Sequence, residues 1–147
     1  MSRLRKAVFI VVYYLEKNKP NYLILERKLH WKGWEFPKGG INFLEFKKHA
    51  VKRELFEETG SKPIKIKNHY FKGKYNYKEE LKDRKGISGQ TFLLFSVQVK
   101  KQKVKLDKKE HKSYLWLDFN KTLKKLTHKN QRQCLRIVNN WLKHDKP

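Results

Sequence analysis

The chain has 147 residues, a single cysteine, and 37 basic against 14 acidic residues, which gives a net charge of +23. This length fits one compact domain, and one cysteine excludes both a disulfide framework and a zinc site built from thiols. A lone thiol suits a reducing compartment, so we expect a cytoplasmic protein. The charge favours phosphate-rich ligands, including RNA, but many lysines beside only two alanines fit a coding bias equally well.

The N-terminal part predicts two strands joined by a turn. Residues 7–15 hold a run of β-branched and aromatic side chains, which is typical of a buried strand. Basic residues before this run imitate a signal peptide. However, no small-residue cleavage site follows and the run is too short to cross a bilayer, so we expect no membrane partner. A turn at 18–20 leads to a second strand at 22–27, and a loop is expected from 31 to 40.

A helix is predicted over 45–59. Asn42 and Glu45 have the spacing of a helix cap and its capping-box partner, and Gly60 is a natural stop. The expected apolar face carries Phe46, Ala50 or Val51, and Leu55.

Three glutamates of this helix, Glu54, Glu57 and Glu58, are expected on one face and largely off the apolar one, because their spacing is i, i+3 and i+4. Their charges repel, and a hard divalent cation such as Mg²⁺ would relieve that repulsion. The alternative is a solvated acidic patch paired with Lys48 or Lys52. Against it, four of the few acidic residues, Glu45 included, crowd around this one helix.

The rest of the chain predicts further strands followed by helices, with no linker or repeat, and therefore a single α/β domain over residues 1–147. Strands are expected near 64–72, 91–99 and 114–117, a polar loop at 73–90, and helices at about 119–126 and 128–143, with Asn120 and Thr127 as caps. Cys134, Ile137, Val138, Trp141 and Leu142 are expected on the core side of the last helix.

The helix and the loop before it resemble the Nudix hydrolase signature. Gly39 and Glu45 are separated by five residues, and seven more precede the segment 53–60, Arg-Glu-Leu-Phe-Glu-Glu-Thr-Gly. The sequence departs from that signature at Leu44, where many relatives have glycine, and at Ser61, where an aliphatic residue is usual. The resemblance implies an α/β/α sandwich, in which a mixed sheet is flanked by helices.

The same resemblance implies a metal-dependent hydrolase of phosphoanhydride bonds. Gly39, Glu54, Glu57 and Glu58 would hold Mg²⁺ or Mn²⁺, with the three glutamates as catalytic residues. The metal would clamp phosphate oxygens and lower the pKa of bound water. Either Glu54 or a more distant carboxylate is the general base. Arg53 is interpreted as structural, pairing with Glu45 or the loop.

Segments outside the signature resemble the asymmetric diadenosine tetraphosphate hydrolases, which implies cleavage of that dinucleotide to ATP and AMP. The similar segments are 34–40, Glu110-His111 with Tyr114 and Trp116-Leu117, and 126–132. Glu110 is then either one more metal ligand or an exposed acid at a strand edge.

Three further residues are candidates for binding substrate. Lys38, directly before Gly39, would contact phosphate, unless it is one solvated lysine among many. Tyr75 or Tyr77 would stack on a base, because an aromatic residue lies at a similar distance past the signature in that subgroup. Both tyrosines could equally cover the sheet.

Two other functions remain open. The segments 36–42 and 53–58, and Gly89-Gln90, also resemble RNA 5′-pyrophosphohydrolases, and the positive charge suits RNA. A non-catalytic nucleotide- or RNA-binding module is the third reading, although binding alone does not need three crowded acids. The sequence predicts no oligomeric state.

Overall fold

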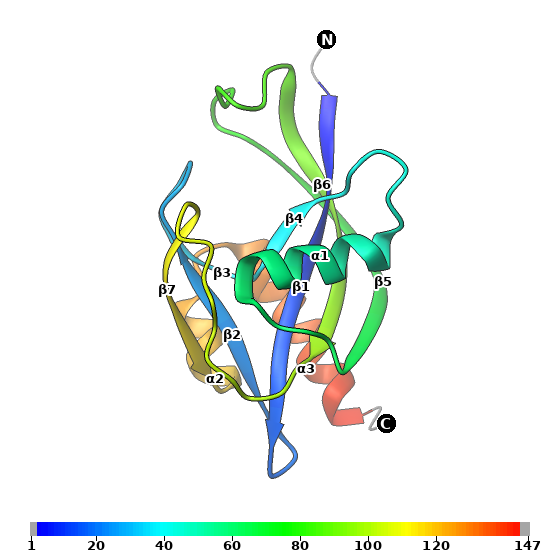
Figure 1. Ribbon diagram of the computed structural model, residues 1–147, viewed down its shortest axis with the longest axis vertical. Helices are drawn as coiled ribbons and strands as arrows, with labels where there is room; N and C mark the ends of the chain where they lie inside the picture. The colour runs from blue at the N-terminus through cyan, green and yellow to red at the C-terminus, as the bar shows by residue number, and fades with distance from the viewer. Residues whose placement is uncertain (1–2, 145–147) are drawn as a thin grey trace.

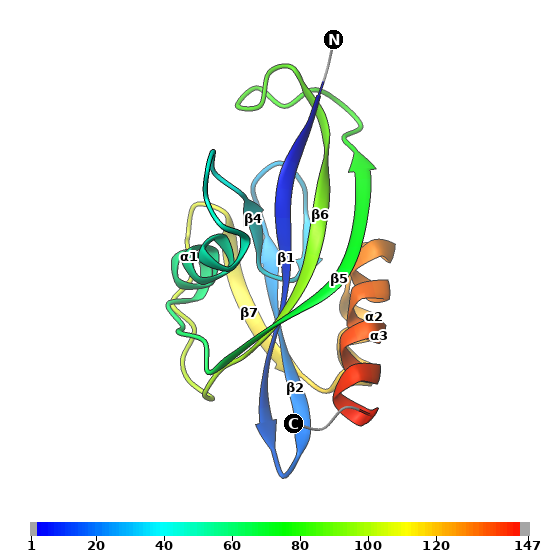
Figure 2. The same cartoon turned by 90° about the vertical axis from the view of Figure 1, so that its right-hand side faces the viewer.

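The computed structural model describes residues 3–144, in which a seven-stranded sheet lies between one helix on one face and two helices on the other (Figures 1 and 2). The elements are β1 (Arg3–Glu16), β2 (Lys19–Arg27), β3 (Gly33–Glu35), β4 (Lys38–Gly40), α1 (Lys47–Thr59), β5 (Lys65–Asn76), β6 (Ile87–Gln98), β7 (His111–Leu117), α2 (Phe119–Lys125) and α3 (Lys129–His144). No helix within this range is long and apolar enough to span a bilayer.

The strand order is β3-β2-β1-β6-β5, with β4 paired to β1 and β7 paired to β2. Strand β1 is parallel to β6, and all other pairs are antiparallel. The sheet is therefore mixed, and the predicted α/β/α sandwich is confirmed.

Strand β1 runs through the centre of the sheet and is covered on both faces. Val8 and Ile10 belong to the core under α1, whereas Phe9 and Val11 belong to the core under α3. Successive side chains of a strand point to opposite faces, so a central strand with two covered faces needs a continuous apolar run. This explains why the run at residues 7–15 is visible in the sequence.

The sheet extends into two segments that were predicted as loops. Strands β3 and β4 lie within the expected loop 31–40, and β5 and β6 shorten the expected loop 73–90 to residues 77–86. Near that loop the strands pair in register, from Lys72 opposite Leu93 to Asn76 opposite Gly89. The alternation of apolar and polar residues that marks a strand was not recognisable in this part of β5, because its lysines lie on an exposed part of the sheet.

Helix α1 begins at Lys47, two residues later than predicted. The residue before it, Phe46, provides no side-chain cap, and its ring is exposed instead of joining the apolar face. Asn42 is not the cap either: its backbone N–H donates a 2.9 Å hydrogen bond to the Glu45 carboxylate, which forms a tight loop before the helix.

The other end of α1 agrees with its prediction. Gly60 has a φ of 73°, in the left-handed region, and its N–H donates to the carbonyl of Phe56 at 2.8 Å. Ala50, Val51 and Leu55 are fully buried against the sheet.

Helix α2 begins at Phe119, as predicted, but its cap is a different residue. Asp118, not Asn120, caps α2 by accepting a hydrogen bond from the backbone N–H of Lys121 at 2.9 Å. The hydroxyl of Thr127 accepts a 2.8 Å hydrogen bond from the backbone N–H of Trp34, which ties the start of α3 to β3.

Candidate active site

Glu58 is the most buried of the three helix glutamates, with a side-chain exposure of 1%. One carboxylate oxygen accepts a 2.9 Å hydrogen bond from the backbone N–H of Lys38. Burial, with the nearby charges of Glu110 and Glu54, raises the pKa of Glu58 well above its ordinary value. The expectation that the glutamates lie largely off the buried face is therefore wrong for Glu58.

The second oxygen of Glu58 lies near a nitrogen of the His111 imidazole. Oε1 of Glu58 lies 3.9 Å from Nδ1 of His111, and both buried atoms have no hydrogen-bond partner. Nε2 of His111 lies 2.9 Å from the Glu35 carboxylate, which can only accept while ionised, so we assign the imidazole proton to Nε2. Two electron pairs then face each other, an arrangement that a cation or a proton would relieve.

Glu110 completes a group of potential metal ligands around these two atoms. Glu58, Glu110 and His111 each offer one ligand atom, and these atoms all lie within 4.8 Å of one another. Two carboxylates and an imidazole form a donor set that suits a divalent cation. Glu110 is partly buried, so it is not the exposed strand-edge acid of the alternative interpretation.

Glu54 lies beside this group and packs directly on Gly39. A Cβ atom at residue 39 would overlap the Glu54 carboxyl group, so glycine is needed there for space. Burial raises the pKa of Glu54 to about 7, although its hydrogen bond from Arg53 opposes the shift. Glu57 and Glu110 also raise this pKa, so all four carboxylates share one electrostatic neighbourhood.

Glu57 differs from the other helix glutamates by its exposure. Its side chain is about half exposed and lies 3.3 Å from Nη1 of Arg53. It does not belong to the close group of ligand atoms formed by Glu58, Glu110 and His111.

Arg53 fastens the helix to the preceding loop, as its interpretation as a structural residue requires. Its Nε and Nη2 donate to Glu45 at 2.8 Å, and Nη2 also donates to the carbonyl of Gly40 at 2.8 Å. Its Nη1 donates to Glu54 at 2.8 Å. One guanidinium thus positions the loop and the Glu54 carboxylate together.

Lys38 is a buried residue of β4 and not a solvated lysine. Its Nζ lies 3.2 Å from the Tyr75 hydroxyl, 3.6 Å from the Glu35 carboxylate and 4.4 Å from the ring centre of Trp31. Burial lowers the pKa of Lys38, and the charge of Glu35 opposes that effect. Its ammonium group therefore contacts aromatic rings and one acid.

Glu35 is a residue whose role the sequence did not predict. It lies 3.0 Å from Nη1 of Arg27, 2.9 Å from Nε2 of His111 and 3.6 Å from Nζ of Lys38. Burial alone would raise the pKa of Glu35, but Lys38, His111 and Arg27 hold it below its ordinary range. This buried anion orients both the imidazole and the lysine.

The two candidate tyrosines are both held by hydrogen bonds, and Tyr75 also packs against the core under α3. The Tyr77 hydroxyl accepts from Nη1 of Arg84 at 2.7 Å and donates to Gln90 at 2.9 Å. The ring of Tyr77 lies 6.4 Å from that of Trp31 at an interplanar angle of 35°.

Trp31 is the second residue that sequence reasoning missed. The charged groups of Lys38 and Arg27 lie 4.4 and 4.8 Å from its ring centre, and its indole N–H donates to Glu35 at 3.2 Å. The one feature of the sequence that could have indicated Trp31 is a tryptophan in a polar loop shortly before the segment 34–40.

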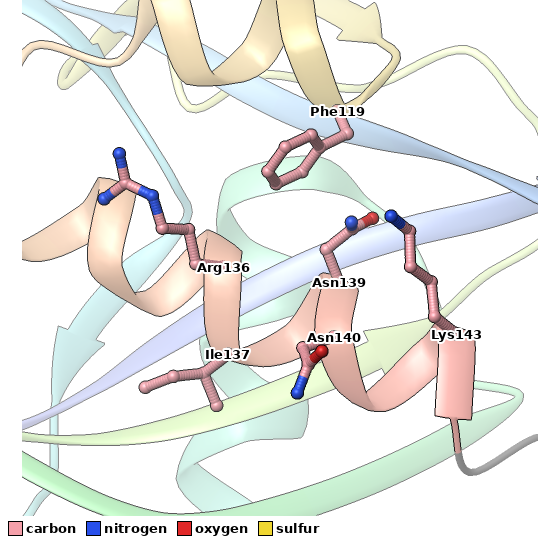
Figure 3. A pocket seen from close by; sticks show the side chains of 6 residues that line it. All are labelled: Phe119, Arg136, Ile137, Asn139, Asn140 and Lys143. Atoms are coloured by element: carbon pink, nitrogen blue, oxygen red, sulfur yellow. The ribbon is translucent and has the colours of Figure 1, made fainter.

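A separate hollow of about 450 Å³ lies on the other layer of the molecule (Figure 3). Its lining residues come from α2 and α3 and are Phe119, Arg136, Ile137, Asn139, Asn140 and Lys143. None of them is acidic, so this hollow lacks the ligands that a metal-dependent reaction on phosphates needs.

Comparison with known proteins identifies the family. Residues 3–136 match the NUDIX domain. Over 53 residues the chain is 38% identical to an RNA pyrophosphohydrolase of Pasteurella multocida, a stretch that covers 36% of this chain and 27% of that relative. The chain therefore matches only about a quarter of that relative's length.

Two solved structures show the same fold. The Ap4A hydrolase of C. elegans in a binary complex has a TM-score of 0.72 and 22% identity, covering 95% of this chain and 98% of the other. The dihydroneopterin triphosphate pyrophosphohydrolase of E. coli has a TM-score of 0.76 and 18% identity, covering 95% and 99%.

The mixed sheet between helical layers, with the group of Glu58, Glu110 and His111 between the end of α1 and the start of β7, defines a protein of the α/β/α class with a candidate metal centre. The family match extends over nearly the whole chain. This protein belongs to the Nudix hydrolase family.

Proposed function

We propose that this Nudix hydrolase cleaves dinucleoside polyphosphates asymmetrically, converting diadenosine tetraphosphate to ATP and AMP with Mg²⁺ or Mn²⁺, in the cytoplasm. The observation that supports this substrate is the position of Lys38. Its backbone N–H binds the metal-site residue Glu58, while its Nζ lies against the ring of Trp31. An aromatic surface suited to a nucleobase thus adjoins a carboxylate group suited to phosphate-bound metal.

The ligand groups for the metal come from three parts of the chain. Glu58, Glu110 and His111 would hold one ion, with Glu54 and Gly39 beside them and Glu57 at the open side of α1. When bound, the metal would neutralise phosphate oxygens and lower the pKa of water. The unpaired atoms of Glu58 and His111 support this assignment.

Glu54 is our candidate for the general base. A base with a pKa of about 7 is partly ionised at neutral pH, so it can accept a proton and release it again. In the proposed step, a water oxygen forms a bond to phosphorus while the bond from that phosphorus to the bridging oxygen breaks. The water proton passes to Glu54, and the leaving phosphate carries away the electron pair of the broken bond.

Trp31 and Tyr77 are our candidates for holding a nucleobase. Stacking of a base on an aromatic side chain contributes about 1–3 kcal/mol. Tyr75 is less accessible, because its ring packs toward Phe9 and its hydroxyl contacts Lys38. We therefore assign Lys38 and Tyr75 to positioning the site and Trp31 with Tyr77 to the base.

Product analysis tests this proposal directly. The protein is incubated with Mg²⁺ and either diadenosine tetraphosphate, a nucleoside triphosphate or 5′-triphosphorylated RNA, and products are separated by ion-exchange chromatography. We expect ATP and AMP in equal amounts from the dinucleotide. If the dinucleotide is inert, the substrate assignment is wrong.

An RNA 5′-pyrophosphohydrolase is the second candidate function. It is supported by the partial match to a relative of that name and by the net charge of +23, which favours binding of a polyanion. Release of pyrophosphate from the RNA alone would favour this function. Binding of these ligands without turnover of any of them would instead indicate a non-catalytic module.

A further inference from the structure

The loop between β4 and α1 displays three apolar side chains to solvent. Phe43, Leu44 and Phe46 are 93%, 84% and 85% exposed. With Asn42, Glu45 and His49 they surround one shallow hollow, so they form a continuous patch. A patch of exposed apolar side chains of this kind marks an interaction surface.

Lysines of the sheet lie on the same face as this loop. Lys72 pairs with Leu93, and Leu93 pairs with Val8, which faces the core under α1. Lys6 and Lys74 lie two residues away along their strands, so their side chains share that face. All three lysines are exposed.

The loop itself begins at this row of lysines. The backbone N–H of Ile41 donates to the carbonyl of Lys6 at 2.9 Å, and the loop lies on the same side of the sheet as α1 in Figure 2. Lys47 and Lys48 follow it directly on α1 and are exposed. The acid within the loop, Glu45, is neutralised by Arg53 at 2.8 Å. Apolar side chains are thus bordered by uncompensated positive charge.

We propose that this surface, formed by Phe43, Leu44 and Phe46 with Lys6, Lys72 and Lys74, docks onto an anionic lipid bilayer. The three apolar side chains enter the boundary between head groups and acyl chains, and the lysines contact lipid phosphates. The protein lies on the membrane and does not cross it. The inference departs from our expectation of no membrane partner, and its reason is the exposure of the loop.

Two other partners, a second copy of this chain and single-stranded RNA, fit this surface less well than an anionic bilayer. A second copy of this chain carries the same net charge of +23, which opposes self-association through a lysine-rich face. Single-stranded RNA stacks its bases on aromatic rings, but Leu44 has no ring, and the patch is a loop tip. Charge complementarity and apolar character together favour an anionic bilayer.

Sedimentation with lipid vesicles tests the proposal, using chelator and no nucleotide so that hydrolysis plays no part. Vesicles contain phosphatidylcholine alone or phosphatidylcholine mixed with phosphatidylglycerol. We expect binding to the mixed vesicles only, weakened by salt. Replacing Phe43, Leu44 and Phe46 together by serine should reduce binding at least about tenfold, because burial of a single such side chain already corresponds to that factor.

Two further variants separate the contributions. The pair Lys72→Gln and Lys74→Gln should weaken binding at low salt and lose its effect at high salt. Ile64→Ser is the matched control, since Ile64 is a 55% exposed apolar residue at the far end of β5, and it should bind like the unchanged protein. Circular dichroism of each variant checks that it is folded.

Several results would overturn the proposal. One is that the unchanged protein fails to sediment with anionic vesicles. Another is that the triple serine variant sediments with them as fully as the unchanged protein does. If the unchanged protein ignores vesicles but binds single-stranded RNA, and the triple variant binds that RNA less, the surface is an RNA site. A dimer that the triple variant cannot form would assign it to self-association. None of these results bears on the proposed hydrolysis.

Discussion

The backbone N–H of Lys38 donates a 2.9 Å hydrogen bond to the carboxylate of Glu58. Lys38 belongs to β4 and Glu58 to the last turn of α1, and both side chains are buried. The bond occupies one oxygen of Glu58 and leaves the other directed at His111. Strand β4 therefore determines the orientation of the Glu58 carboxylate of α1.

Glu58→Gln should lower kcat by roughly 10²-fold or more, because the site loses a ligand charge that acts in the transition state. The thermal stability of this variant, in contrast, should not decrease. The raised pKa of Glu58 favours the neutral carboxyl when no metal is bound, and an amide in its place can donate to Nδ1 of His111. We expect an unchanged or higher thermal midpoint in chelator, measured by circular dichroism.

The activity and the stability of the unchanged protein and of Glu57→Gln should be measured for comparison. Activity of the unchanged protein should vanish with chelator and return with Mg²⁺ or Mn²⁺. Glu57→Gln should also lower kcat by roughly 10²-fold, with little change in stability because the side chain is half exposed. Full activity of Glu58→Gln would refute the metal site formed with Glu110 and His111, and full activity of Glu57→Gln would remove Glu57 from the catalytic residues.

Gly39→Ala should disable the site by displacing Glu54, since the new methyl group would occupy the space of its carboxyl group. We expect a loss of kcat with little unfolding, because the displaced group is the end of a flexible side chain. The double-mutant cycle is decisive: in a Glu54→Ala background, Gly39→Ala should have almost no further effect. An equal loss in both backgrounds would show that the glycine acts through something other than Glu54.

Glu35→Ala should destabilise the fold by about 3–5 kcal/mol, because Arg27, Lys38 and His111 would lose their shared buried anion. Urea unfolding monitored by tryptophan fluorescence measures this. Glu26→Ala is the comparison, since Glu26 makes its ion pair with Lys112 near the surface and should matter much less. Equal effects of the two substitutions would mean that the buried network contributes nothing specific.

Trp31→Ala should raise KM for the dinucleotide about 5- to 150-fold, equivalent to the loss of one stacked base. The effect should be similar at low and high salt, and Tyr77→Ala should behave alike. Because Lys38 is buried, Lys38→Ala should also show little salt dependence, unlike a surface lysine.

Trp141→Ala is the control for this series, since Trp141 belongs to α3 and its ring packs against that of His69 in β5. If Trp31→Ala and Tyr77→Ala leave KM unchanged, the rings support the sheet and the enzyme binds its substrate mainly through phosphates.

The stability of the protein should fall between pH 6.5 and about 4 in part because of His69. Burial lowers the pKa of His69 from 6.5 to about 4. In that window the unfolded chain binds a proton that the folded chain does not, so acid favours unfolding. His69→Gln should lessen the decrease of the thermal midpoint across the window. An identical pH profile for the variant would contradict the assignment.

Local signals in the sequence were sufficient for the larger elements. The apolar run of β1, the helix spacing of α1 and the stop at Gly60 each depend on near neighbours, and the structure confirms them. Strands β3 and β4 have three residues each, too few to show a period, and they exist because of partners in β2 and β1.

The site was only partly visible because its contacts join distant parts of the chain. The signature predicted Glu54 and Glu58, and Lys38 was expected either to contact phosphate or to be solvated, but neither expectation included its burial. Its burial depends on Tyr75 and Glu35, and the orientation of His111 likewise depends on Glu35. Such partners have no fixed spacing in a sequence.

The single cysteine of the chain gives this protein an internal reporter. Cys134 is fully buried in α3, and burial raises the pKa of its thiol to about 12. Only the thiolate reacts with alkylating reagents, so the folded molecule should be inert to them. The rate of alkylation at this one sulfur then measures how often the helical layer opens, and no residue of the protein has to be changed for it.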